Sequence, residues 1–112
     1  MIEQISTIDA PGAVGPYSHA IKAGDLVFIS GQLPIDPATG EFDSVNVAEQ
    51  AEQCLSNLQA IAKVDGTELS NTVKTTVLLT DLGDFIVVNR VFASFFSPPI
   101  PARAFYEVKD AK

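Results

Sequence analysis

The sequence has little of the chemistry that metal and redox sites use. It contains one cysteine, one histidine, one methionine and no tryptophan. A single cysteine cannot form an internal disulfide, and one cysteine with one histidine falls short of the three or four ligands of a zinc site. Cys54 lies on an apolar helical stripe and His19 in the middle of a predicted strand. We therefore expect a buried thiol and a packed imidazole, with neither a metal site nor a cysteine–histidine nucleophile pair.

Positive charge is also scarce. Seven lysines and arginines stand against fourteen acidic residues, which gives a net charge of −7. The five lysines are scattered, whereas a nucleic-acid binder usually presents a basic stripe. The acidic balance disfavours a phosphate backbone as a partner. Of the two arginines, Arg90 and Arg103, the second leads into a run of strand-forming residues, where its donors would need an anion.

Long apolar runs and signature loops are missing as well. No stretch approaches the 18 or so apolar residues of a membrane span, and "MIEQISTIDAPG" lacks the features of a signal peptide. There is no repeat, no GxGxxG, no Walker loop and no GxSxG. We predict a cytoplasmic protein without a membrane partner, in which residues 1–112 form a single domain.

Periodicity predicts an order of strand, strand, helix, strand, helix, strand. Two strands, at 17–23 and 26–32, are joined by the turn signal Gly24-Asp25. A capping box at Asn46 and Glu49 begins a helix that ends at 65–66. The remaining predicted elements are an edge strand at 1–6, a strand at 72–80, a helix between about 84 and 96 that the following prolines end, and a strand at about 103–108.

This order predicts an α+β fold with one mixed β-sheet. A helix between two strands favours parallel pairing of those strands, with both helices packed on one face. The chain has no third helix to cover the other face. Self-association is the simplest way to bury that surface.

Three features fit poorly with simple packing. Asn89 falls within the apolar stripe of the second helix, where its amide either caps a neighbouring backbone or contacts a ligand. Ser30-Gly31 ends an apolar strand, and glycine there often marks the close approach of a ligand or another backbone. Tyr17 follows Gly15-Pro16, which fixes how it enters its strand.

Taken together, these motifs are similar to those of one family. The segments "GPYSHAI" (15–21), "FISGQLPIDPATGE" (28–41), "VKTTVLLTDLGDF" (73–85), "VNRVFASFF" (88–96) and "PARAFYEV" (101–108) occur in one order and spacing. From about residue 5 to residue 108 the chain resembles the RidA/YjgF/L-PSP family of reactive-intermediate deaminases. The paired S-G-Q-x-P and P-A-R signatures are the most specific part of the resemblance.

The resemblance implies a chorismate-mutase-like homotrimer in which the sheets form a central barrel and the ligand sites lie between subunits. It implies a cofactor-independent hydrolase that converts 2-iminobutanoate and 2-iminopropanoate to 2-oxo acids and ammonia. Arg103 would bind the substrate carboxylate. The full expected site is Arg103, Tyr17 and Ser30 as catalytic residues, with Gly31, Asn89 and Phe105 completing substrate binding.

The chain departs from the family pattern in three places. The family usually has a small hydroxyl or thiol residue where this chain has Phe105, and the segment between Phe96 and Pro101 is short. The family also continues beyond "EV" with a loop, a Leu-Pro turn and a final strand that carries a water-orienting glutamate, whereas this sequence ends at "EVKDAK". Glu107 does not match that glutamate. We therefore expect the natural polypeptide to be longer.

Other functions are compatible with the same scaffold. The chain could be a carboxylate-binding regulatory module that has lost hydrolysis. An endoribonuclease is disfavoured by the acidic composition and the single histidine. A chorismate mutase would need more cations around its dianionic substrate.

Overall fold

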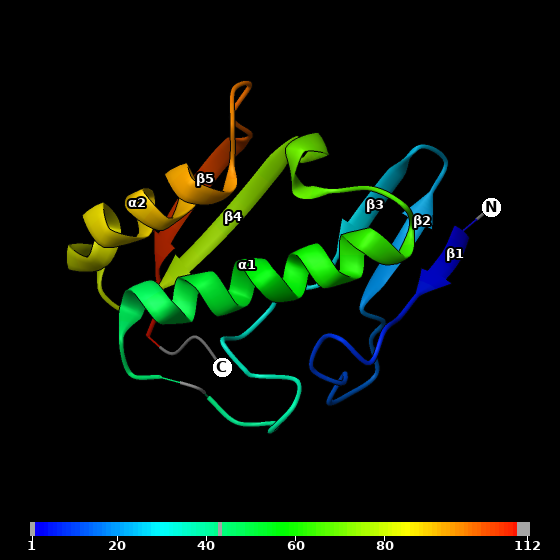
Figure 1. Ribbon diagram of the computed structural model, residues 1–112, viewed down its shortest axis with the longest axis horizontal. Coiled ribbons are helices and arrows are strands. Elements are labelled where there is room, and N and C mark those ends of the chain that lie inside the picture. Colours follow the sequence, from blue (N-terminus) through cyan, green and yellow to red (C-terminus); the bar gives the residue numbers. More distant parts are fainter. Residues whose placement is uncertain (1, 43, 110–112) are drawn as a thin grey trace.

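A computed structural model of the chain describes residues 2–42 and 44–109 (Figure 1). Two α-helices lie on the same side of five short β-strands, which confirms the α+β class. The elements are β1 (Ile2–Ile5), β2 (Ala20–Ala23), β3 (Leu26–Ile29), α1 (Val47–Val64), the 3₁₀ turn η1 (Leu69–Asn71), β4 (Lys74–Leu79), the 3₁₀ turn η2 (Leu82–Asp84), α2 (Phe85–Phe95) and β5 (Ala102–Glu107).

The N-terminal strands form an antiparallel ladder in the order β1-β2-β3. Ala23 pairs with Leu26 across a two-residue turn in which Gly24 has a φ of 62°, as the Gly-Asp pair predicts. Both strands of this hairpin are shorter than predicted, because the ladder pairing ends at Ala20 and Ile29. His19 was expected in the middle of a strand, and this was wrong. It lies just before β2, where backbone groups of a loop hold its imidazole.

The C-terminal strands form a separate parallel ladder. β4 and β5 pair in register from Lys74–Ala102 to Leu79–Glu107, with α2 as the crossover between them. Parallel and antiparallel pairing therefore both occur, as in a mixed sheet. The expectation of one continuous sheet was wrong for the described residues, since their hydrogen bonds form two ladders and none joins β3 to β4.

Helix α1 joins the two ladders through the core. Asn46 caps it, with Oδ1 accepting a hydrogen bond from the Glu49 N–H at 3.2 Å, as predicted. Ile61, near its C-terminal end, packs in a cluster with Ile5 and Ala20 of the N-terminal ladder. Leu55, closer to its middle, packs in a second cluster with Leu69, Val91 and Phe96, which come from η1 and from in and just after α2. One amphipathic helix thus covers both halves of the molecule.

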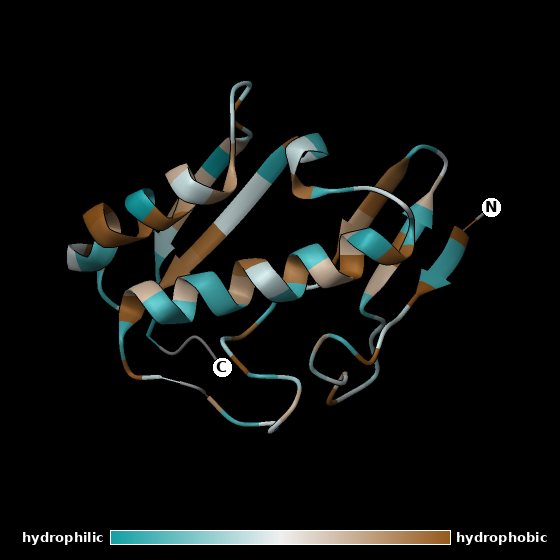
Figure 2. Cartoon of the chain, viewed as in Figure 1, coloured by the Kyte–Doolittle hydropathy of each residue, from teal (hydrophilic) through white to brown (hydrophobic). Residues whose placement is uncertain are grey.

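The strand faces turned away from the helices carry exposed apolar side chains. Figure 2 shows hydrophobic colouring along β3 and at one end of β4. Across the five strands, the apolar side chains that are more than half exposed include Ile2, Leu26, Phe28, Leu78 and Tyr106. Among the residues that the structure describes, no helix combines the length and the hydropathy needed to cross a membrane. An exposed apolar face of this kind supports self-association.

Candidate functional site

Arg103 sits on β5 against a cluster of aromatic rings. Its guanidinium carbon lies 4.3 Å from the ring centre of Phe105, 5.5 Å from that of Phe92 and 5.6 Å from that of Phe85. Phe105 is two positions along the same strand, so both side chains lie on the same face of β5. The other two rings come from α2. This packing restricts the planar guanidinium by cation–π contact while the residue stays exposed.

Arg103 has no carboxylate partner in the part of the chain that the structure describes. The one ion pair found there joins Lys22 to Asp65 at 3.1 Å. Glu107, on the same face of β5, is engaged elsewhere: Oε1 accepts a hydrogen bond from the Leu82 N–H at 3.1 Å. The guanidinium fork is therefore available for an external anion.

Two buried polar atoms flank this region without a hydrogen-bond partner among the described residues. They are Oδ1 of Asn89 and Oγ1 of Thr75. Asn89 lies four residues after Phe85 and three before Phe92, so it shares the helix face that meets Arg103. Thr75 is the register partner of Arg103 across the β4–β5 ladder. The sequence left open whether Asn89 caps a backbone, and no described backbone N–H donates to its Oδ1. Unpaired buried polar atoms are rare enough in proteins to suggest a ligand-binding role.

Tyr17, Ser30 and Gly31 form a second group at the other ladder. The Ser30 hydroxyl donates to the Ser18 carbonyl at 2.6 Å, and the Tyr17 hydroxyl accepts from the Val14 N–H at 3.4 Å. The Tyr17 side chain is 48% exposed. A Cβ added to Gly31 would meet no atom within 4 Å, and its φ is not in the left-handed region. Nothing in the described chain therefore requires glycine at 31.

Helix α1 fixes the segment that follows Gly31. The Cys54 thiol donates to the Gln32 carbonyl at 3.2 Å. Asn57 is 1% exposed, and its Nδ2 donates to the carbonyls of Leu33 and Ile35 at 3.2 and 3.0 Å. Asn57 was not among the site residues predicted from the sequence, although its position three residues after Cys54 places it on the same helix face. These bonds hold the segment that follows Gly31 against α1, and so position the half of the candidate site that contains Ser30 and Gly31.

His19 and Cys54 have the structural roles that were expected of them. The Thr7 N–H donates to Nδ1 of His19, and Nε2 lies 2.7 Å from the Pro11 carbonyl, so the neutral Nε2–H tautomer satisfies both contacts. Burial raises the pKa of the Cys54 thiol to about 11, which keeps it protonated. In the described ranges, no three histidine, cysteine or acidic side chains are grouped to hold a metal ion.

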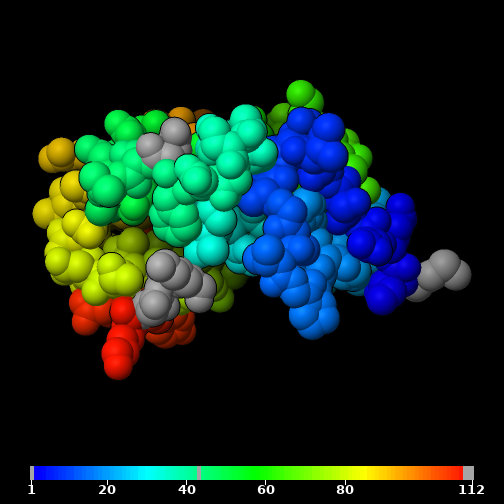
Figure 3. All heavy atoms as spheres, turned by 90° about the horizontal axis from the view of Figure 1, so that it is seen from below, coloured from blue at the N-terminus to red at the C-terminus, as the bar shows by residue number. Residues whose placement is uncertain are grey.

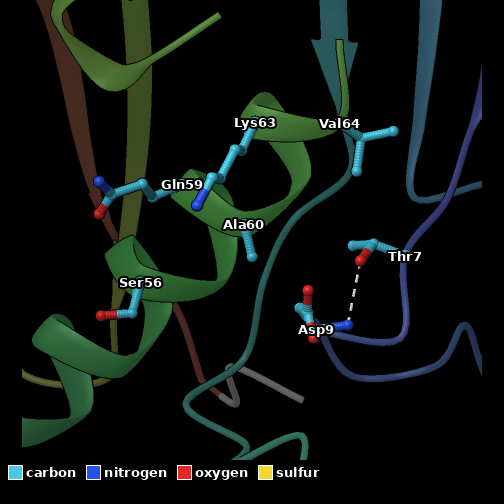
Figure 4. A pocket seen from close by; sticks show the side chains of 7 residues that line it. All are labelled: Thr7, Asp9, Ser56, Gln59, Ala60, Lys63 and Val64. Carbon is cyan, nitrogen blue, oxygen red and sulfur yellow. Dashed lines mark hydrogen bonds between the residues drawn. The ribbon is translucent and has the colours of Figure 1, made fainter. Parts of the chain in front are cut away.

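A polar groove lies between α1 and the N-terminal loop, away from all the predicted site residues. Figure 4 shows Thr7 and Asp9 facing Ala60, Lys63 and Val64 across it. Its volume is about 330 Å³. Thr7 is occupied in the loop itself, where its Oγ1 accepts a hydrogen bond from the Asp9 N–H at 3.0 Å. Within the described residues, no hydrogen bond joins the Ser56 hydroxyl to Asp9 or Lys63 in this groove.

The structure therefore separates the predicted site into two groups. Arg103, Asn89 and Phe105 belong to β5 and α2, whereas Tyr17, Ser30 and Gly31 flank β2 and β3. Figures 1 and 3 place β5 and the N-terminal strands on opposite sides of the molecule. No hydrogen bond or ion pair between the two groups is present in the described residues. One chain alone does not assemble all six residues into one site.

The chain belongs to the RidA/YjgF/L-PSP family. The model of the endoribonuclease L-PSP family matches residues 7–112, nearly the whole sequence. This confirms the family resemblance seen in the sequence motifs. Names in this family cover both deaminases and endoribonucleases, so membership alone does not fix the reaction.

Individual relatives are similar over most of the chain. A RutC family protein of Sinorhizobium fredii is 77% identical over 109 residues, which are 97% of this chain and 86% of that protein. Human 2-iminobutanoate/2-iminopropanoate deaminase is 48% identical over 104 residues, 93% of this chain and 76% of the human protein. The crystal structure of RidA from a Psychrobacter species has a TM-score of 0.92 at 48% identity, and covers 96% of this chain and 86% of that one.

Proposed function

We propose that the protein is a cofactor-independent deaminase that hydrolyses 2-imino acids to 2-oxo acids and ammonia. The observation that carries the proposal is Arg103, an exposed guanidinium held against aromatic rings with no carboxylate partner among the described residues. A planar fork binds a carboxylate through two parallel hydrogen bonds, which fixes orientation as well as charge. The human relative, which is named 2-iminobutanoate/2-iminopropanoate deaminase and is 48% identical in sequence, supports the same reaction class.

Hydrolysis of an imine depends more on how the protein positions the substrate and the water than on a strong catalytic acid or base. The carbon of a protonated imine is already electrophilic, so the protein has to hold the acid and orient one water toward that carbon. Arg103 takes the carboxylate. The unpaired Oδ1 of Asn89 can accept a hydrogen bond from the iminium nitrogen or the water. Attack of water gives a carbinolamine, which then releases ammonia and leaves the 2-oxo acid.

The complete site forms between two copies of the chain in a homotrimer. The separation of the two groups supports this part of the proposal, because the Arg103 group and the Tyr17 group lie on different ladders of one chain. The exposed apolar strand face supports self-association. Gly31 supports close approach from outside, because no atom of the described chain lies where its Cβ would stand. In the trimer, Tyr17 and Ser30 of one copy would face Arg103 of its neighbour.

The reaction is tested with an imino acid made in solution. An amino acid oxidase acting on alanine or 2-aminobutanoate releases the 2-imino acid, and semicarbazide traps whatever the protein has not hydrolysed. We expect the protein to lower semicarbazone formation in proportion to its concentration, and Arg103→Ala to abolish the effect. Arg90→Ala removes the other arginine, which is exposed on α2, and serves as the matched control. Binding of 2-oxobutanoate without any acceleration would instead indicate the carboxylate-binding module.

A further inference from the structure

An apolar hollow lies directly beside Arg103. It occupies about 540 Å³ between η2, the first turn of α2 and β5. The residues that line it are Leu82, Gly83, Phe85, Ile86 and Phe105. None of them carries a charged or hydrogen-bonding side chain, so the hollow favours an apolar group.

Two of the residues that line the hollow also contact the Arg103 guanidinium. Phe85 and Phe105 both line the hollow, and both rings lie within 5.6 Å of the Arg103 guanidinium carbon. The two rings are 4.7 Å apart between centres and tilted by 53°. Phe85 and Phe105 thus present aromatic surface to the hollow, and a further aromatic group can pair with such rings in a tilted or offset arrangement. A molecule that reaches both features therefore needs an anionic end and an apolar end a few atoms apart.

The size of the hollow argues against the smallest acids. Its volume lies within the range of about 300–1,000 Å³ typical of small-molecule pockets. A phenyl ring would cover more of the apolar wall than a methyl or ethyl side chain would. Arg103 and the hollow would thus contribute separately to the affinity for one ligand.

We propose that the hollow is the side-chain pocket of the deaminase site and gives the protein a preference for 2-imino acids with large apolar side chains, above all a phenyl ring. The inference rests on the proposed function, because it places the substrate carboxylate on Arg103. Phe105 and Phe85 are its specificity-determining residues, since their rings connect the cation to the apolar wall.

The preference is measured by calorimetry with two product acids, pyruvate and phenylpyruvate. We expect phenylpyruvate to bind the unmodified protein at least tenfold more tightly. Phe105→Ala should weaken the binding of both acids, because its ring also supports Arg103, and should reduce the preference for phenylpyruvate to less than threefold. Phe105→Leu keeps an apolar residue in case the alanine variant does not fold, and should lose part of the preference for phenyl. Phe42→Ala removes an exposed aromatic ring outside the hollow, and should leave both affinities unchanged.

The outcomes separate this inference from the proposed function. Equal affinity for the two acids, with Arg103→Ala abolishing both, would overturn the pocket and leave the carboxylate site intact. A preference that persists in both Phe105 variants would also overturn the pocket. If neither acid binds, both the pocket and the proposed function are wrong. Thermal unfolding of each variant confirms that its binding data come from folded protein.

Discussion

The guanidinium carbon of Arg103 lies 4.3 Å from the ring centre of Phe105, two positions further along the same strand. Side chains at such positions share one face of a strand, so the ring supports the guanidinium from below. Cation–π contact satisfies the guanidinium plane but none of its five N–H donors. Arg103 is therefore held in place and still able to bind an anion.

Replacing Arg103 with lysine should weaken carboxylate binding even though the charge is kept. Lysine loses the planar fork and the stack on Phe105, so we expect 2-oxobutanoate to bind more weakly by about 1–3 kcal/mol. Isothermal titration calorimetry measures the difference. The control is Arg90→Lys, which should bind like the unmodified protein. Equal affinity in the Arg103 and Arg90 variants would show that Arg103 does not hold the carboxylate.

Asn57→Leu and Asn89→Leu should differ in their effect on stability. Asn57 satisfies the Leu33 and Ile35 carbonyls, so Asn57→Leu should cost about 2–4 kcal/mol in the free energy of unfolding. The buried Oδ1 of Asn89 has no partner in the described chain, so Asn89→Leu should change that free energy by less than about 1 kcal/mol. Urea denaturation measures both variants.

The same asparagines should differ in ligand binding. Asn89→Leu should weaken 2-oxobutanoate binding about tenfold, the worth of one hydrogen bond, since its amide N–H would donate to the 2-oxo oxygen of this ligand. A stability loss in Asn89→Leu as large as in Asn57→Leu, with binding unchanged, would assign Asn89 a purely structural role.

The Cys54 thiol should be unreactive and should make stability depend on alkaline pH. Burial raises its pKa from 9.0 to about 11, so at pH 8 only about one molecule in a thousand carries the thiolate, and labelling by iodoacetamide should be slow until the chain unfolds. Between pH 9 and 11 the unfolded thiol ionises while the folded thiol stays protonated. The free energy of unfolding therefore falls as the pH rises through this window, and is unaffected below it.

Cys54→Ala provides the comparison for that pH dependence. Lysines and tyrosines titrate in the same range in both proteins, so the informative quantity is the difference between the two stability curves. We expect the unmodified protein to lose about 2–3 kcal/mol more than the variant between pH 8.5 and 11.5. Parallel curves from urea denaturation at each pH would show that the thiol is not buried in solution.

Local patterns predicted the elements of the fold well. The Gly24-Asp25 turn, the Asn46 cap and the parallel β4–α2–β5 unit are each encoded within a few residues or by a single helix between strands. The continuity of the sheet is not local, because it depends on which strand edges meet. Periodicity therefore predicted one sheet where the described residues form two ladders.

The candidate site was harder to predict for a related reason. Arg103 and Asn89 could be selected because a charge and an amide stand out among apolar neighbours. Asn57 could not be distinguished by residue type, since its role depends on two carbonyls more than twenty residues away. The aromatic support of Arg103 combines rings from α2 and β5, and only the packed structure brings them together.

The strand faces turned away from the helices should mediate a homotrimer. One chain has a mass of 11.9 kDa, so light scattering should give about three times that value. Phe28 is 61% exposed on this face, and Phe28→Glu should dissociate the assembly because burying an unpaired charge is costly. Val45→Glu changes an exposed valine in a loop before α1, and should leave the assembly intact. A stable monomer of the unmodified protein at micromolar concentration would contradict a site shared between copies.

Mixed assemblies should reveal whether the two groups of site residues come from different copies. Arg103→Ala and Tyr17→Ala should each be inactive alone, because each removes one half of every site. When the two variants are co-refolded in equal amounts, a site is intact if the first contributes Tyr17 and the second contributes Arg103. Random assortment gives that pairing at about a quarter of the sites, so about a quarter of the unmodified activity should return. A site built within one chain predicts no recovery, since every chain in the mixture carries one defect.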